Sequence, residues 1–537
     1  MSFTQDHKGA TLGELEHVDT TEQVLNDHSM ARQGAEGEHK LGFWAAMRLY
    51  PKAAMWSILL STAIIMEGYD IVLIQSFFAQ PSFKAKYGEY IASTDTYEIT
   101  ASWQNGLSNA VSCGTIIGAF ANGYFTHKFG YRKVLLASLI AICCCIFISF
   151  FSPNLPVLLV GQFLCGIPWG VFATMAPAYA SEVCPMALRG YLTVYVNLCW
   201  AIGQLISAAI QRAFSEMAGE WSYRIPFAIQ WAWPAPLFIV LWFAPESPWH
   251  FVRMEKYREA EKALARLSSR PDQIKQTLAM MVHTNEIEKG VDDGTSYWDC
   301  FRGVDLRRTE IACLAFAAQP FCGSALGGTP TYFFIQAGLP TSISFSMSVG
   351  GLGLASVGTI FSWYLLHVFG RRTLYLWGLG LLTMVLMIVG FISVGAPNSE
   401  AGNYAQASMM LLWLGIYYST VGPICYAIIS EVSSTRLRNK SVCLSRIVYY
   451  VAQIICNVVN PYMINPTAGD WKGKTGFFWG GCALAFFIWT FFRLPETKGR
   501  TFEELDILFM RGINAREFEK YKVDAYVEKD EALVKER

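Results

Sequence analysis

Apolar stretches of about 20 residues alternate with short polar segments along most of the chain, and each is long enough to cross a bilayer as a helix. Twelve such stretches are visible, near residues 52–78, 104–125, 133–151, 156–182, 191–213, 225–244, 310–336, 345–368, 373–394, 406–430, 441–464 and 476–494. Six precede a long polar segment, 246–309, and six follow it. The pattern predicts an all-α integral membrane protein with about 12 transmembrane helices.

Two carboxylates interrupt the first apolar stretch. Glu67 and Asp70 are three residues apart, so a helix places them on one face. A charge in hydrocarbon costs at least about 2.5–3.5 kcal/mol on insertion scales, so an intramembrane carboxylate indicates a functional group that faces protein or a water-filled cavity. The alternative is a solvated pair near the helix end. Within the run Met55–Phe78, about twelve residues precede Glu67 and eight follow Asp70, which favours the functional interpretation.

An internal repeat divides the chain into two halves. Three short motifs recur 249, 240 and 250 residues later, each at the same place in a set of six apolar stretches. The pairs are Ser181-Glu182-Val183 with Ser430-Glu431-Val432, Gly130-Tyr131-Arg132 with Gly370-Arg371-Arg372, and Pro245-Glu246-Ser247 with Pro495-Glu496-Thr497. Two homologous six-helix halves with a substrate site between them near the midplane are one known transporter plan.

The short loops predict the orientation. Basic residues follow the second, fourth, eighth and tenth stretches, and the loops after the third, seventh and ninth contain no Lys or Arg. Because basic residues accumulate on the cytoplasmic side, we expect both termini to be cytoplasmic. The predicted divisions are a disordered cytoplasmic head at 1–45, the N-terminal half at 46–245, a cytoplasmic helical linker at 246–309, the C-terminal half at 310–494 and a cytoplasmic tail at 495–537.

Composition agrees with a membrane protein and argues against other classes. Charged residues make up 16% of the chain, against roughly 25% in ordinary soluble domains. Basic and acidic residues both number 42, so no nucleic-acid partner is expected. The nearest approach to a nucleotide-binding loop, Gly469 to Thr475, has three residues between its glycines where four are required. No metal-ligand spacing or catalytic constellation is visible, so we expect a non-enzyme without a cofactor or a metal.

The repeated motifs, together with others along the chain, resemble those of sugar porters of the major facilitator superfamily. They are Gly68-Tyr69-Asp70, Gly123 through Lys133, Pro177 to Gly190, Pro245-Glu246-Ser247-Pro248, Gly370-Arg371-Arg372, Gly422-Pro423 with Ser430-Glu431, and Pro495-Glu496-Thr497-Lys498-Gly499. Within the family, Glu67-Gly68-Tyr69-Asp70, Gly161-Gln162 with Gly166-x-Pro168-Trp169-Gly170, and Tyr332-Phe333 with Gln336-Ala337-Gly338-Leu339 look most like the fungal α-glucoside (maltose) permeases, which are proton symporters. The resemblance implies the major facilitator fold.

The resemblance also implies candidate sugar contacts. Hexose porters generally carry two adjacent glutamines and a downstream asparagine in the seventh span, where this chain has Gln319, Pro320 and Ala325. The remaining matched positions are Asn197, Gln204, Tyr426, Tyr449 and Tyr450. Small side chains at Asn197 and Ala325 leave room for a second ring, which suits a disaccharide. The alternative is that these residues only pack against their neighbours and were substituted without any effect on sugar binding.

Charged positions depart from the family pattern as well. Proton-coupled relatives usually pair the first-span aspartate with an arginine in the fourth span, where this chain has Gln162. Arg446 is the candidate counter-charge to the acid pair, although it could instead extend to the cytoplasmic interface. The candidates for a cytoplasmic gate are Glu182, Arg189, Glu431, Arg438, Arg132 and Arg371.

The sequence therefore predicts proton-coupled uptake of a sugar, with an α-glucoside disaccharide such as maltose as the expected substrate and the proton as coupling ion. The alternatives are a transporter-like sugar sensor, a facilitated uniporter, or a symporter of hexose, cellobiose or lactose. We expect a monomer in the plasma membrane that contacts only its sugar and lipid.

Overall fold

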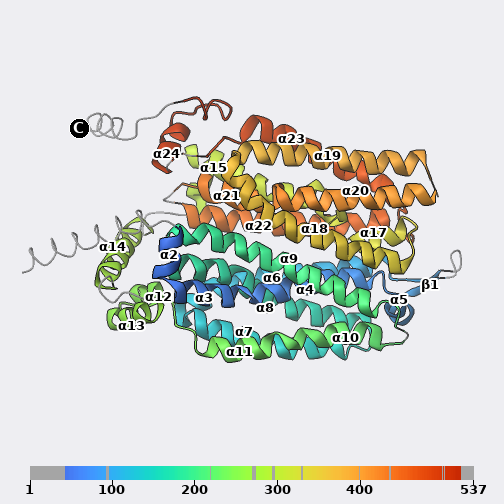
Figure 1. Ribbon diagram of the computed structural model, residues 1–537, viewed down its shortest axis with the longest axis horizontal. Helices are drawn as coiled ribbons and strands as arrows, with labels where there is room; N and C mark the ends of the chain where they lie inside the picture. Colours follow the sequence, from blue (N-terminus) through green and yellow to red (C-terminus); the bar gives the residue numbers. More distant parts are fainter. Residues whose placement is uncertain are drawn as a thin grey trace, which may run out of the picture.

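The computed structural model of the protein describes residues 43–521, apart from residues 92–95, 185, 218, 269–273, 293–296, 328–329, 398, 435–436, 499 and 501. Long helices run side by side along its longest axis (Figure 1). Most of the predicted head, 1–45, and the tail beyond residue 521 lie outside the described residues. The short helix α2 (Phe43–Leu49) begins within the predicted head.

The first six apolar stretches form the helices of the N-terminal half. Their bounds are α3 (Pro51–Ser61) with α4 (Ala63–Phe77), α6 (Ala101–Phe129), α7 (Tyr131–Phe150), α8 (Leu155–Val183), α9 (Met186–Phe214), and α10 (Trp221–Ile229) with η1 (Gln230–Ala232) and α11 (Pro234–Trp242). The sixth span is broken at η1, and α11 restarts with Pro234 in its first turn, where a missing N–H leaves no helical bond unmade.

The last six stretches form the C-terminal half. Their bounds are α15 (Gly303–Gln319) with η4 (Pro320–Ser324), α16 (Ala325–Gly327) and α17 (Pro330–Gln336), then α18 (Thr341–Val368), α19 (Arg371–Gly395), α20 (Glu400–Ser419) with α21 (Val421–Val432), α22 (Arg438–Ile464) and α23 (Thr475–Arg493). The seventh span is broken at η4, where Pro320 lacks an N–H and Gly323 adopts a φ of 96°. Every stretch predicted from hydropathy falls on one of these helices or broken helices.

The two halves repeat one packing arrangement. In the N-terminal half α6 packs on α8, α4 on α9, and α7 on α11; in the C-terminal half the matching pairs are α18 with α20, α15 with α22, and α19 with α23. The halves meet through α9 against α18 and α6 against α22, which lie in the middle of Figure 1. These two contacts are equivalent under the repeat, so the homologous halves predicted from three motifs are visible in the packing.

Shorter elements mark the two ends of the bundle. One end, called here the linker end, carries α2, α12 (Pro248–Arg253), α13 (Tyr257–Leu267), α14 (Ile274–Asp292) and α24 (Phe502–Met510) (Figure 1). The opposite end, called the hairpin end, carries α5 (Pro81–Tyr87) and the antiparallel strands β1 (Glu89–Ile91) and β2 (Thr96–Glu98). The helical linker was predicted, whereas the hairpin was not. The remaining short turns are η3 (Tyr297–Phe301) and η5 (Lys472–Lys474).

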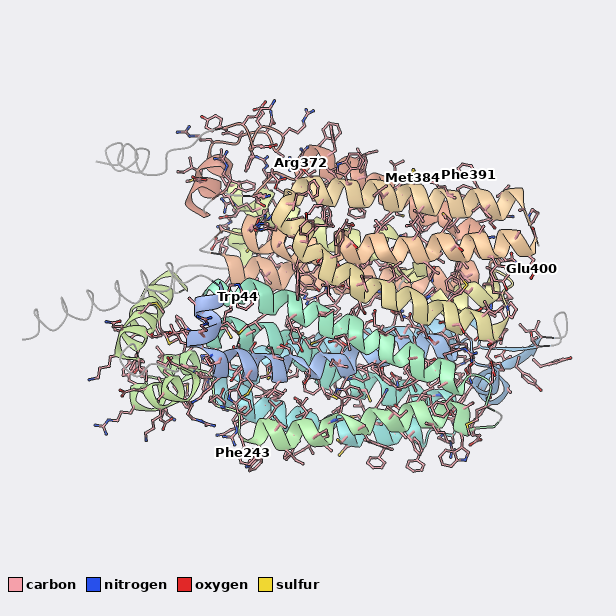
Figure 2. The ribbon with its side chains drawn as sticks, in the orientation of Figure 1. Trp44, Phe243, Arg372, Met384, Phe391 and Glu400 are labelled. Atoms are coloured by element: carbon pink, nitrogen blue, oxygen red, sulfur yellow. The ribbon has the colours of Figure 1, made fainter. Side chains whose placement is uncertain are left out.

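The outer surface of the bundle suits a lipid environment. Phe391 and Met384 project from the outer side of α19, with exposed fractions of 65% and 54% (Figure 2). Among the described residues, nine helices are long and apolar enough to cross a membrane, or ten if the bent pair Gly303–Gly327 and Pro330–Gln336 forms one span. The helices α6 and α9 are also of spanning length, with 29 residues each, and they lie at the interface between the halves.

Candidate functional site

Asp70 is buried inside the N-terminal half, with an exposed fraction of 1%. The side chain of Gln230, in the break between α10 and α11, donates a hydrogen bond from Nε2 to Oδ1 of Asp70 over 2.6 Å. The second carboxyl oxygen, Oδ2, is buried and has no hydrogen-bond partner among the described residues. Asp70 therefore faces protein, and one of its oxygens remains able to take up a proton.

Glu67 lies one turn earlier on α4 and has a different partner. It is half-buried and interacts electrostatically with Arg446 of α22, in the opposite half. The Arg446 guanidinium lies over three aromatic rings, 5.2 Å from the centroid of Phe316, 5.3 Å from Tyr426 and 6.0 Å from Tyr449. Arg446 thus interacts with one of the two acids, while the other accepts a hydrogen bond from Gln230. Its role as a counter-charge to both acids stays a prediction.

The arginine is held within the bundle by these rings. Its Nη1 donates to the hydroxyl of Tyr426 over 3.4 Å, and Tyr449 packs edge-on against Phe316, with centroids 5.7 Å apart. Tyr450 packs against Tyr449 at 5.6 Å. Three predicted sugar contacts, Tyr426, Tyr449 and Tyr450, thus gather around Arg446. A cation over aromatic faces is favourable when desolvated, so the cluster fixes the position of the charge.

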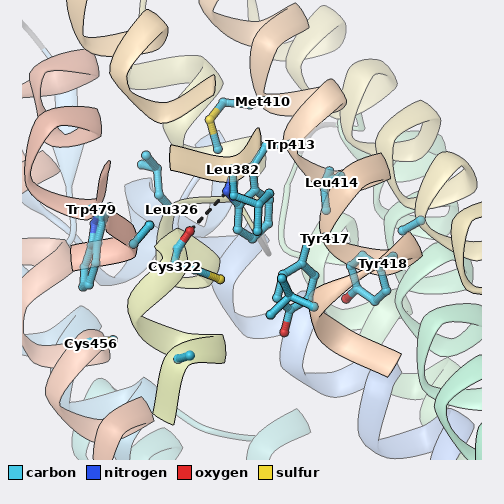
Figure 3. Close-up of a cluster of buried hydrophobic side chains, with 14 of the residues drawn as sticks. Cys322, Leu326, Leu382, Met410, Trp413, Leu414, Tyr417, Tyr418, Cys456 and Trp479 are labelled. Carbon is cyan, nitrogen blue, oxygen red and sulfur yellow. Dashed lines mark hydrogen bonds between the residues drawn. The ribbon is translucent and has the colours of Figure 1, made fainter. Parts of the chain in front are cut away.

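The predicted glutamines each accept a hydrogen bond from a tyrosine that the sequence did not single out. Gln204 of α9 accepts from the Tyr418 hydroxyl over 2.8 Å, which joins the two halves. Gln319 of α15 accepts from the Tyr417 hydroxyl over 3.1 Å. Both tyrosines lie at the end of α20, beside the buried cluster around Trp413 (Figure 3). Adjacent tyrosines in a span were the available signal for them.

That cluster is buried and joins α20 to the broken seventh span. Trp413 stacks on Tyr417 with centroids 5.0 Å apart and planes 9° apart, and its indole N–H donates to the backbone oxygen of Cys322 over 3.2 Å (Figure 3). This bond reaches the broken segment η4, since a break in a helix makes backbone oxygens available to donors outside the helix. Asn197 is half-buried, and its amide nitrogen makes no hydrogen bond with the described residues.

A small cavity of about 50 Å³ lies between the halves, toward the hairpin end. Helices of both halves form its wall, and the lining residues are Gln75, Phe78, Gln104, Ser108, Ala325, Leu326, Tyr332, Phe333, Asn457, Asn460, Pro461 and Ile464. Of these residues, only Ala325 was predicted to line a pocket. The amide and hydroxyl residues at Gln104 and Ser108, one helical turn apart, were a signal for this polar wall.

Two carboxylates at the linker end organise the C-terminal half. Glu431 forms an ion pair with Arg371 at 2.9 Å and accepts from the Thr497 hydroxyl at 2.5 Å. Glu496 accepts from the backbone N–H of Arg371 over 2.8 Å and so caps the start of α19. A Cβ at Gly370 would lie 2.0 Å from this carboxylate, which explains the glycine.

The N-terminal half repeats this network with different donors. Glu246 accepts from the backbone N–H of Tyr131 over 2.8 Å and of Arg132 over 3.1 Å, at the start of α7. Burial raises the pKa of Glu246 above its ordinary value, against the effect of these N–H donors. Glu182 accepts from the Tyr131 hydroxyl over 2.9 Å and pairs with Arg253 of the linker helix α12. Tyr131 thus occupies the position in the N-terminal half that Arg371 occupies in the C-terminal half.

The predicted cytoplasmic gate is brought together only in part. Glu182 and Glu431 each pair on their own side of the bundle, with Arg253 and Arg371. The guanidinium of Arg132 lies over Trp242, 5.8 Å from the ring centroid, and donates to that residue's backbone oxygen. The side chains of Arg189 and Arg438 lie outside the described part of the structure. A gate between the halves stays a prediction.

Comparison with known proteins agrees with this architecture. The family model for "Sugar (and other) transporter" matches residues 56–509. Maltose permease MAL31 of Saccharomyces cerevisiae is 39% identical over 536 residues, covering 98% of this chain and 87% of that protein. The general alpha-glucoside permease of the same yeast is 38% identical over 540 residues, with the same coverage of 98% and 87%.

Solved structures share the fold at lower identity. The major facilitator proton:xylose symporter XylE bound to 6-bromo-6-deoxy-D-glucose aligns with a TM-score of 0.69 at 19% identity, over 86% of this chain and 99% of that one. A partially occluded inward-open form of XylE from E. coli also gives 0.69, at 18% identity over 84% and 100%. The chain therefore shares the fold of these structures, and it belongs to the sugar transporter family of the major facilitator superfamily.

Proposed function

We propose that the protein carries out proton-coupled uptake of an α-glucoside disaccharide, such as maltose, by alternating access. The observation that carries the proposal is the buried Asp70 with one unpartnered oxygen, next to Glu67 facing Arg446 across the interface. Relatives named as maltose and alpha-glucoside permeases support the substrate class. The similarity to a structure named as a proton:xylose symporter supports coupling to protons.

In this mechanism the sugar binds between the halves and a proton neutralises the acid pair. A carboxylate in a dry site resists ionisation, so a neutral pair lowers the cost of reorienting the halves around it. One proton moving through 100 mV supplies about 2.3 kcal/mol, which at 1.36 kcal/mol per tenfold sustains roughly a fifty-fold sugar gradient. One proton per sugar is sufficient for accumulation.

The same proposal includes the setting of the protein. The linker end, with its basic residues, faces the cytoplasm, both termini are cytoplasmic, and the protein acts as a monomer in the plasma membrane. Sugar and lipid are its partners, and the proton is its only coupling species. Reaction of single cysteines placed at Glu261 of α13 and at Tyr90 of β1 with a membrane-impermeant reagent on intact cells tests the orientation. Labelling at position 90 alone is expected, and labelling at position 261 contradicts it.

The decisive experiment is uptake in transporter-null yeast cells. Radiolabelled maltose, trehalose, sucrose, cellobiose, lactose and glucose are offered singly, and external pH is recorded in unbuffered suspension. We expect accumulation of an α-glucoside above its external concentration, proton entry with sugar, and loss of accumulation with a protonophore. Equilibration without proton entry indicates a uniporter, and the absence of any uptake indicates a sensor. A preference for glucose, cellobiose or lactose contradicts the substrate class.

A further inference from the structure

We propose that two equivalent sites at the linker end, one in each half, bind the headgroup of an anionic phospholipid. Each site consists of two arginines beside two exposed aromatic residues, at the point where a spanning helix ends. The members are Arg132 and Arg266 with Trp242 and Phe243 in the N-terminal half, and Arg372 and Arg516 with Phe491 and Phe492 in the C-terminal half. The sites are called here the α11 site and the α23 site, after the helices that end there. The inference goes beyond the proposed function.

The α11 site is built around the last backbone oxygens of α11. Arg132 of α7 donates to the backbone oxygen of Trp242, and its guanidinium lies 5.8 Å from the centroid of that indole. Arg266 of the linker helix α13 donates to the next backbone oxygen, that of Phe243, over 2.5 Å. Phe243 is 65% exposed and projects from the outer surface of the bundle (Figure 2). Because neighbouring carbonyls hold the two guanidiniums, both positive charges lie at one helix end.

The α23 site repeats this arrangement on the opposite outer side of the bundle. Arg372 of α19 donates to the backbone oxygen of Phe491 over 2.9 Å, and its guanidinium lies 5.7 Å from the centroid of that ring. The guanidinium of Arg516, from the tail, lies 5.6 Å from the centroids of both Phe491 and Phe492. Phe492 is 55% exposed. The second arginine thus comes from the linker in one half and from the tail in the other, although the two segments are not part of the repeat.

The described residues do not neutralise these four charges. Other arginines of the linker end form ion pairs, as Arg253 does with Glu182. Within the described part of the chain, no carboxylate forms an ion pair with an arginine of either site. The nearby Glu246 and Glu496 accept from backbone N–H groups at the starts of α7 and α19, and Glu519 acts on the α23 site only at longer range. Like charges held close together repel each other, so an anion beside them is stabilised.

The surroundings favour a lipid headgroup as this anion. Exposed aromatic residues at the ends of spanning helices lie at the level of the headgroups. A phosphate there can accept from both arginines, since a guanidinium has more N–H donors than one backbone oxygen uses. The ammonium group of phosphatidylcholine would bring a further positive charge, whereas phosphatidylserine has a net negative charge. The proposed orientation of the linker end places both sites in the leaflet that carries anionic lipids, where basic pockets between helices bind such headgroups.

The test counts the lipids bound to the full-length protein purified in detergent. Native mass spectrometry records the binding of phosphatidylserine and of phosphatidylcholine to wild type, Arg266→Gln, Arg516→Gln and the double variant. We expect two tightly bound phosphatidylserine molecules on wild type. One of them should bind about fivefold more weakly in each single variant, and both in the double variant, which is the effect of one basic residue near an anionic headgroup. Phosphatidylcholine should bind more weakly and equally to all four proteins.

Matched controls remove an exposed cation near each site without belonging to it. Arg258→Gln lies on α13, as Arg266 does, and Lys520→Gln lies on the tail, as Arg516 does. The unfolding temperature of every variant is measured to show that it is folded. Equal losses in the control variants, equal affinity for the two lipids, or displacement of phosphatidylserine by an equal concentration of inorganic phosphate overturns the proposal. Because sugar uptake is not measured, neither result depends on the proposed transport function.

Discussion

The side-chain amide of Gln230, in the break of the sixth span, donates to the carboxylate of Asp70 over 2.6 Å. An amide supplies a hydrogen bond without a full charge. Asp70 is therefore held in position, and its hydrogen-bond partner among the described residues carries no positive charge that would oppose protonation. This arrangement makes Asp70 the expected proton carrier.

Asp70→Asn is expected to abolish uphill accumulation and sugar-induced proton uptake. Asparagine keeps the shape and the hydrogen-bonding capacity of the side chain but cannot take up a proton. Exchange of sugar down its gradient should survive, because it needs only a neutral group at this site. A pH electrode in an unbuffered cell suspension measures the proton uptake. Intact proton uptake in this variant removes Asp70 from the coupling mechanism.

Gln230→Leu is expected to change the pH dependence of uptake while leaving downhill exchange in place. A hydrogen bond donated to a carboxylate favours its charged form, so its loss favours the protonated carrier and uptake should persist to higher pH. Gln230→Asn, which is shorter by one methylene, serves as the conservative control. The initial rate of uptake across a pH series provides the measurement. An unchanged profile means that Gln230 has only a packing role.

Arg446→Gln is expected to reduce sugar transport more on its own than in combination with Glu67→Gln. The single change leaves a partly buried carboxylate without the charge that faces it, whereas the double change removes both charges. We expect at least a tenfold loss of accumulation in the single variant and recovery of downhill exchange in the double variant. Additive effects would show that the two groups are not coupled.

Tyr418→Phe and Gln204→Ala are expected to raise the apparent KM for sugar by about three- to tenfold each, which corresponds to one net hydrogen bond. Because the two side chains bond to each other over 2.8 Å, the double variant should show less than the product of the single effects. Gln319→Ala and Tyr417→Phe form the matching pair within the C-terminal half. Normal kinetics in all four variants would exclude these residues from the site.

Glu246→Ala and Glu496→Ala are expected to lower the thermal stability of the purified protein. Each carboxylate caps the N-terminus of a spanning helix, α7 or α19, and the loss of such a cap costs about 0.5–2 kcal/mol. Glutamine at either position should restore part of the loss, since it still accepts from backbone N–H. Glu261→Ala, on the exposed side of α13, is the control. Unfolding temperatures equal to wild type would contradict the capping role.

The hydropathy pattern and the repeated motifs of the sequence are sufficient to predict the architecture. A helix that crosses the bilayer needs an apolar segment of a set length, and its backbone groups must all form hydrogen bonds within the protein. The order of apolar and polar residues therefore predicts all twelve spans and both halves. The sequence also indicates that the acid pair is functional, because a charge within an apolar stretch carries a high free-energy cost. The strands β1 and β2 were missed, since three-residue strands in a polar loop leave no periodic signal.

The partners of these residues were decided only by the tertiary structure. Three residues at 3.6 per turn leave side chains about 60° apart, and that difference is enough to turn Asp70 toward Gln230 and Glu67 toward Arg446. The bonds of Gln204 with Tyr418 and Gln319 with Tyr417, and the cavity beside Ala325, join helices far apart in sequence. Helix rotation and register are set by packing against neighbours, which hydropathy does not encode.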